Sequence, residues 1–124
     1  KLTLGSFVRL AIQRQDKSQR IMGIRANDEH VEVAGMSEGT RDQLYLSFRL
    51  AALELQMASA AEPLPFIVDD ILVNFDDDRA RATLEILSQI ADRTQVLFFT
   101  HHRRMLELAD KLPTLSHRVH ILTT

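Results

Sequence analysis

The sequence predicts an α/β fold in which a short antiparallel β-meander precedes a parallel sheet with flanking helices. Three observations support this prediction. Residues 1–34 alternate strand-like segments with polar turns, residues 37 to about 59 repeat apolar side chains at helical spacing, and the rest of the chain alternates short apolar segments with helical ones. Strands that alternate with helices favour a parallel sheet with right-handed crossovers.

The bulk properties are those of one ordinary globular domain. The chain has 124 residues, 26% of them charged, and a net charge of -2, which argues against a strongly basic nucleic-acid-binding module. The absence of cysteine excludes disulfides and thiolate metal sites and permits a reducing compartment. Since no apolar run approaches the roughly 20 residues of a membrane helix, we expect a cytoplasmic protein without a membrane partner.

The first elements are predicted to be strands. Segments 4–13, 20–26 and 30–35 contain the apolar residues, and the polar segments QDKSQ and NDEH separate them. Short apolar segments joined by polar turns predict an antiparallel meander.

The next element is predicted to be a long, largely buried helix. Its N-cap is Ser37, because a serine directly before a helical repeat can accept a hydrogen bond from the first turn. The apolar residues at helical spacing, with those that widen the face, are Leu44, Leu46, Phe48, Leu50, Ala51, Leu53 and Leu55.

The second half is predicted to contain three strands and two helices. The segments PFIVDD and QVLFFT have the apolar runs of parallel strands buried on both faces, and RVHIL is expected to be a last strand. The helices are expected at 78–92 and 102–111. The first of these helices places one set of residues on one face: Ala80, Leu84, Leu87 and Ala91.

Polar side chains follow two of these strands. One strand ends in Asp69 and Asp70, and the other in Thr100, His101 and His102. The carboxyl ends of parallel strands meet at one edge, where ligands bind. An apolar strand that ends in an acidic pair is the Walker B pattern, in which one carboxylate holds Mg²⁺ and the next orients or deprotonates water. Strand-end aspartates are also common turn formers, so that alternative stays open.

The segment MSEGT, residues 36–40, opens the long helix. Ser37 and Gly39 expose backbone N–H groups at a helix N-terminus, where the helix dipole favours anions. A plain N-cap followed by a tolerated glycine is the alternative.

In this order, the motifs resemble the C-terminal half of an ABC-type ATPase head. MSEGT stands at the signature LSGGQ, FIVDD at Walker B, NFD at the D-loop, and FFTHH places His101 at the switch histidine. The flanks EGTRDQLYLSFRLA, GSFVRLAI and VNFDDDRA are similar to the SMC-like and double-strand-break-repair class, most of all to its YhaN-like subgroup. The resemblance extends from about residue 4 to 122.

The resemblance implies a P-loop NTPase-type (ABC ATPase) half-domain. Residues 1–124 would be the C-terminal lobe of a split head, since the sequence lacks G-x-x-x-x-G-K-[ST] and heptads. The N-terminal lobe with the P-loop and the coiled coil would be absent. The complete protein would be an ATPase in DNA repair, whereas this chain alone would be inactive. The implied partners are its own P-loop lobe, a second head across sandwiched ATP, DNA and a nuclease subunit.

The resemblance also assigns roles to residues, with ATP and Mg²⁺ as cofactors. Asp69 would bind the metal, and Asp70 and His101 would be catalytic. The nucleotide contacts would be Ser37, Glu38, Gly39, Thr40, Asn74 and Asp76. The sequence departs from the family at Thr40, where Gln or Glu is usual, and at Asp70, where glutamate is usual and reaches one methylene further.

Two other functions remain open at this stage. The chain would be a non-catalytic dimerisation or DNA-facing module if these departures abolish hydrolysis. It would be a metal-dependent phosphoesterase if one two-metal site were formed by Asp69, Asp70, Asp76, Asp78, His101 and His102. We otherwise expect His102, Arg103 and Arg104 to be exposed, and Asp77 and Asp78 to cap the following helix.

Overall fold

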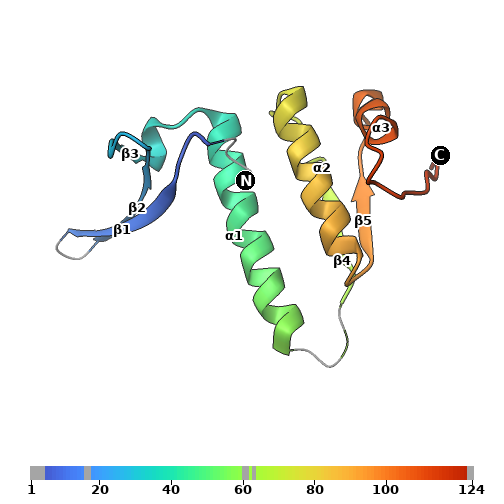
Figure 1. Cartoon of the computed structure of the whole chain (residues 1–124), viewed down its shortest axis with the longest axis horizontal. Helices are drawn as coiled ribbons and strands as arrows, with labels where there is room; N and C mark the ends of the chain where they lie inside the picture. Colours follow the sequence, from blue (N-terminus) through green and yellow to red (C-terminus); the bar gives the residue numbers. More distant parts are fainter. Residues whose placement is uncertain (1–4, 16–17, 60–61, 63, 123–124) are drawn as a thin grey trace. The chain divides into compact units, whose positions relative to one another are not determined.

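The computed structural model describes residues 5–15, 18–59, 62 and 64–122. The chain divides into two compact units, Lys1–Ala58 and Ser59–Thr124. Figure 1 shows the antiparallel strands and the long helix of the first unit, and the parallel strands and the helices of the second. No helix in the described ranges is both long and apolar enough to cross a bilayer.

The first unit begins with the predicted meander. Strands β1 (Arg9–Gln15), β2 (Ser18–Ile24) and β3 (His30–Glu32) form an antiparallel sheet in the order β1-β2-β3. The third strand is shorter than predicted, because residues Val33–Gly35 turn into a 3₁₀ helix, η1. Two apolar side chains of β2, Met22 and Ile24, are buried.

Helix α1 (Glu38–Ser59) follows and has nearly the predicted bounds. Its buried residues lie in the first half, up to Leu50. The prediction of a largely buried helix is therefore wrong for the second half, where Ala51 is exposed and Leu55 is 75% exposed. Helical periodicity identifies an apolar face, but it does not identify the element that covers that face.

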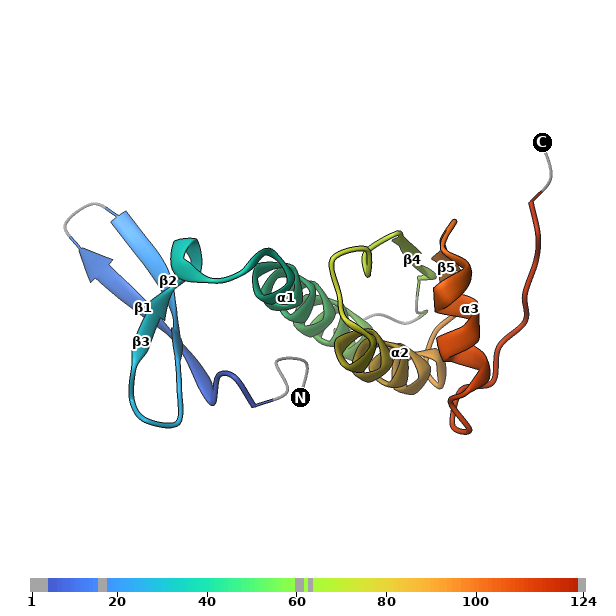
Figure 2. The ribbon, with the colours of Figure 1, turned by 90° about the horizontal axis from the view of Figure 1, so that it is seen from above.

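The second unit is built on two parallel strands, β4 (Phe66–Asp69) and β5 (Val96–Phe99). Helix α2 (Asp77–Ala91) contacts β5 and helix α3 (Arg103–Asp110), and Figure 2 shows both helices beside the strands. The predicted face of α2 is buried at Ala80, Leu84 and Leu87, but its last member is Ile90, because Ala91 is exposed.

Two predictions for this sheet are wrong. The strands are not buried on both faces, since Ile67, Leu97 and Phe99 are 63%, 36% and 41% exposed. Residues 118–122 form no strand within the described part of the chain. Both differences have one reason: an apolar run shows that a segment avoids water, whereas burial and strand pairing need a neighbouring element in place.

Candidate functional site

The chain bends sharply where β4 ends. The backbone N–H of Asp70 still donates to the carbonyl of Phe99 at 3.0 Å, which extends the pairing with β5 by one residue. Asp70 itself has a φ of 45°, in the left-handed region. Aspartate tolerates this conformation better than most residues with a side chain. The turn redirects the chain while Asp70 stays beside the end of β5.

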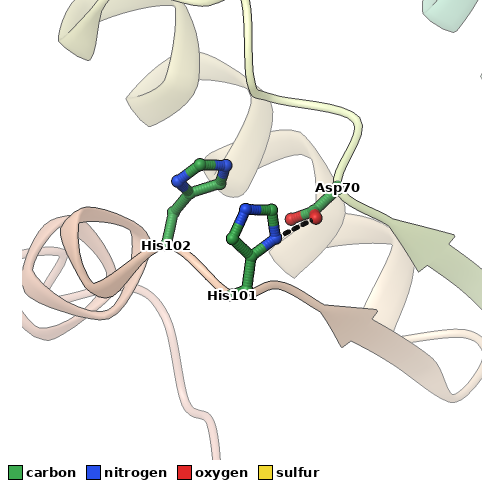
Figure 3. A group of neighbouring side chains, drawn as sticks. All are labelled: Asp70, His101 and His102. Atoms are coloured by element: carbon green, nitrogen blue, oxygen red, sulfur yellow. Dashed lines mark hydrogen bonds and ion pairs between the residues drawn. The ribbon is translucent and has the colours of Figure 1, made fainter.

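Asp70 and His101 meet at this edge (Figure 3). The Nδ1 atom of His101 donates to the Oδ2 atom of Asp70. Burial alone would raise the pKa of Asp70, but the neighbouring Thr100 hydroxyl and the His101 imidazole outweigh it and hold that pKa below its ordinary value of 3.8. The carboxylate is therefore ionised at neutral pH and acts as a hydrogen-bond acceptor.

His102 lies in the same group; the sequence placed it there only in the two-metal alternative and otherwise predicted an exposed residue. Its backbone N–H donates to the Thr100 hydroxyl at 3.1 Å, and its ring centroid lies 3.9 Å from that of His101. The residue is half-buried rather than exposed. The sequence signal for a site role of His102 was its position directly after His101. The direction of its side chain, however, depends on the local turn.

Asp69 lies at the end of β4 on the open face of the sheet. In the parallel register it pairs with Phe99, and Ile67 pairs with Leu97 on the same face. Its side chain is exposed, and no described residue makes a hydrogen bond to it in this structure. An exposed carboxylate is a suitable oxygen ligand for Mg²⁺.

The loop after Asp70 leads into helix α2, whose N-cap is Asp76. Its carboxylate accepts from the Arg79 N–H at 2.9 Å and pairs with the Arg79 guanidinium at 3.2 Å. Asp77 and Asp78 lie in the first turn of this helix, where the sequence predicts carboxylates that favour its dipole, but the cap itself is Asp76, one position earlier. Asn74 is exposed in the preceding loop.

Arg104 of α3 is engaged in contacts within this unit. It donates to the carbonyl of Phe75 at 3.0 Å and to the carboxylate of Asp77 at 2.5 Å. These contacts connect the start of α3 to the start of α2. The expectation that Arg103 and Arg104 are exposed is confirmed for both residues, although Arg104 also makes these contacts.

The signature-like residues belong to the first unit and start α1. The Ser37 hydroxyl lies 2.9 Å from the Thr40 hydroxyl and accepts from the Thr40 N–H at 3.4 Å. Ser37 is therefore the N-cap of α1, as predicted. Thr40 occupies the third helical position, and its contacts with Ser37 support the cap. Glu38 is exposed and Gly39 is buried in the first turn.

The arrangement does not assemble the six residues of the alternative two-metal site. Asp76 caps α2, and Asp78 pairs with Arg81 at 3.4 Å. Among the described residues, the side chains that could share a metal ion are Asp70, His101 and His102. A two-metal phosphoesterase therefore has no support in this geometry.

Comparison with known proteins gives one sequence relative and two structural neighbours of note. No protein family model matches the chain. It is 30% identical over 105 residues to the uncharacterized protein YhaN of Bacillus subtilis strain 168, covering 84% of this chain but only 10% of YhaN. The chain thus spans one tenth of the length of this relative.

The structural neighbours are SMC head domains. One comes from a study of ATP-driven dimerisation and DNA-stimulated activation of SMC ATPases, with a TM-score of 0.62 and 17% identity over 90% of this chain and 69% of the other. The other is the Pyrococcus furiosus Smc head with an extended coiled coil, bound to the C-terminal domain of ScpA. It has a TM-score of 0.62 and 21% identity over 89% of this chain and 27% of the other. The chain has the fold of SMC heads, and the resemblance to the SMC-like and YhaN-like class is confirmed.

Proposed function

We propose that this chain is the C-terminal lobe of an SMC-like ATPase head that binds and hydrolyses ATP. A P-loop lobe elsewhere in the same protein and a second head would complete its site. The observation that carries the proposal is the pairing of Asp70 with His101 at the carboxyl edge of β4 and β5, next to the exposed Asp69. Open parallel sheets bind ligands at this edge, so polar groups paired there are positioned to contact a ligand.

The pair has suitable chemistry for the attack of water on a phosphoryl group. Because Asp70 remains ionised, it accepts a hydrogen bond from the attacking water and orients it; its lowered pKa makes it a weak base. With Nδ1 donating to Asp70, Nε2 of the largely exposed His101 can donate to a phosphate oxygen when the ring is an imidazolium, in which both nitrogens carry a hydrogen. Bound Mg²⁺ would neutralise phosphate charge, and Asp69 is the residue that would hold it.

The start of α1 is suited to bind the same phosphate from a second head. The Ser37 oxygen accepts from the Thr40 N–H, and either hydroxyl of the Ser37–Thr40 contact can be the donor. With Thr40 as that donor, the exposed Ser37 can donate its own hydroxyl hydrogen to a phosphate oxygen. The free backbone N–H groups of the first turn and the positive end of the helix dipole would also favour phosphate binding there. Glu38, Gly39, Asn74 and Asp76 are assigned to nucleotide contacts on the family resemblance alone.

The open face of the β4–β5 sheet is assigned to the missing lobe. Its exposed side chains, Ile67, Leu97 and Phe99, are apolar, and burying such area is favourable by about 25 cal/mol per Å². The relative YhaN is about ten times longer than the aligned region, so further chain is available to cover it. Two such heads, joined by ATP, would act in the cytoplasm on DNA with a nuclease subunit.

Nucleotide binding tests this proposal. The chain alone should bind ATP weakly by calorimetry, because the P-loop and its lysine supply most of the contacts to the β- and γ-phosphates. In the complete protein, Asp69→Ala should weaken Mg²⁺-ATP binding, and Asp92→Ala, which changes an exposed aspartate at the end of α2, should not. Tight Mg²⁺-dependent ATP binding by the chain alone, or an Asp69→Ala protein that binds like its parent, would contradict it.

A further inference from the structure

The cluster of Asp70, His101 and His102 has a composition that ATP hydrolysis does not require. Each residue offers one ligand atom, and these atoms all lie within 4.8 Å of one another. Figure 3 shows the two imidazole rings side by side at the end of β5, with Asp70 facing them from the end of β4. The proposed function uses Asp70 and His101 but gives His102 no role.

Two atoms of the cluster lack hydrogen-bond partners. Asp70 Oδ1 and His102 Nε2 are buried, and no described residue makes a hydrogen bond to either. Buried polar atoms without a partner are rare and cost stability, so each calls for an explanation. One cation would satisfy both atoms, since carboxylate oxygen and neutral imidazole nitrogen are both metal ligands.

We propose that Asp70, His101 and His102 form a binding site for one transition-metal dication of the Zn²⁺ type. Two imidazoles and one carboxylate are a common protein ligand set for such ions, and they leave a coordination position open. Zinc–ligand bonds of about 2.0–2.2 Å require ligand atoms roughly 3.4 Å apart. His101 can rotate to reach that spacing, because its side chain is 73% exposed.

The site discriminates between metals by its nitrogen ligands. Mg²⁺ prefers oxygen ligands and retains its water, so it stays with Asp69 and the phosphates. A Zn²⁺-type ion binds imidazole strongly. The next step rests on the proposed function. When this ion occupies the site, Asp70 can no longer orient the attacking water and His101 can no longer contact the phosphate, so hydrolysis is inhibited.

Metal titration of the untagged chain without nucleotide tests the site directly. Zn²⁺ should bind with a stoichiometry of one by calorimetry, and Co²⁺ should give visible absorption typical of a nitrogen-coordinated ion. His102→Ala should weaken Zn²⁺ binding by at least about 10-fold. Even the loss of a residue that only hydrogen-bonds to a metal ligand weakens metal binding by about 10- to 100-fold. His120→Ala, which changes an exposed histidine outside the cluster, should bind like the parent.

Circular dichroism should show that both variants keep the parental fold. A His102→Ala chain that binds Zn²⁺ as tightly as the parent would overturn the site, as would equal losses in His102→Ala and His120→Ala. Excess Mg²⁺ should not displace Zn²⁺; displacement would also contradict the assignment.

Hydrolysis by the complete protein separates this proposal from the proposed function. Zn²⁺ should inhibit the parent at concentrations that leave the His102→Ala protein active. Binding without inhibition of a working ATPase would keep the metal site and remove Asp70 and His101 from catalysis. Unchanged ATP hydrolysis with no Zn²⁺ binding would refute the metal site and leave the ATPase proposal intact.

Discussion

His101 donates a hydrogen bond through Nδ1 to the Oδ2 atom of Asp70, although 31 positions separate the two residues in the sequence. The contact exists because β4 and β5 are parallel neighbours that end at the same edge of their sheet. It joins an ionised carboxylate to an imidazole, and this pair is the basis of the first two predictions.

Removing the charge of Asp70 should separate nucleotide binding from hydrolysis. In the complete protein, Asp70→Asn should bind Mg²⁺-ATP nearly as the parent does, because the amide keeps the shape of the side chain. Turnover should fall by about 10²- to 10⁴-fold, the usual contribution of a group that handles the proton of the attacking water. Calorimetry and steady-state kinetics measure the two effects, with Asp92→Asn as the control. Parental turnover in Asp70→Asn would show that Asp70 does not position water.

The lowered pKa of Asp70 should make stability depend on pH in a defined direction. A carboxyl group whose pKa is lower in the folded than in the unfolded chain stabilises the fold above its unfolded pKa, about 3.9, and loses that contribution as pH falls through its folded pKa. The difference in free energy of unfolding between the parent and Asp70→Asn should therefore be constant above about pH 5 and shrink below about pH 4.

Urea denaturation across this range, with carbon-13 NMR titration of the carboxyl group, gives the measurement. His101→Ala should raise the pKa of Asp70, because it removes a hydrogen-bond donor, whereas His120→Ala should leave it unchanged. A pKa of Asp70 that does not respond to His101→Ala would mean that the contact is not populated in solution.

The Ser37 hydroxyl is predicted to bind phosphate as well as cap α1. Ser37→Gly keeps most of the capping free energy, within a few tenths of a kcal/mol, but removes the hydroxyl; Ser37→Arg also blocks the approach of phosphate. In an Asp70→Asn background, light scattering with ATP should show weaker dimerisation for Ser37→Gly and none for Ser37→Arg. Ser59→Arg makes the same change at the other end of α1 and is the control. Parental dimerisation by both Ser37 variants would leave Ser37 with a capping role alone.

Asp76 is predicted to have two separable roles. Asp76→Ala should lower the free energy of unfolding by about 1 kcal/mol, because it removes the N-cap of α2. Asp76→Asn should retain the cap, since asparagine caps as well as aspartate, yet weaken ATP-driven dimerisation if the family role is correct. Asp78→Ala, which loses only an exposed ion pair, should change stability by less than about 1 kcal/mol. Equal stability of Asp76→Ala and Asp78→Ala would refute the capping assignment.

Gly23 is predicted to tolerate no side chain. A Cβ atom there would lie 2.5 and 2.6 Å from the Phe7 ring and 2.8 Å from Met36 Cε, so Gly23→Ala forces the packing of β2 to shift. We expect a loss of about 1–3 kcal/mol in the free energy of unfolding by urea. Gly35→Ala is the matched control, because its nearest neighbour would be an ordinary 3.8 Å away. Gly23→Ala with parental stability would contradict the close packing.

The sequence by itself determined the local elements and their order. The meander, the bounds of α1 and α2, and the polar residues after β4 and β5 all follow from periods, turns and caps that lie within a few residues of one another. Ser37 was identified as a cap for the same reason, since its partner Thr40 is one turn away. Parallel pairing of neighbouring strands then predicted that Asp70 and His101 share an edge.

Only the tertiary structure decided which apolar faces are covered and which side chains meet. The exposure of Ile67, the lack of pairing at 118–122, and the contact of Arg104 with Asp77 depend on elements distant in sequence. Hydrophobicity shows that burial of a side chain would be favourable, but the assembled fold decides which element, if any, covers it. His102 lies beside Asp70 and His101 where Asp70 turns the chain in a left-handed conformation directly after β4 and the His102 N–H bonds to the Thr100 hydroxyl, and neither local feature appears in a periodic pattern.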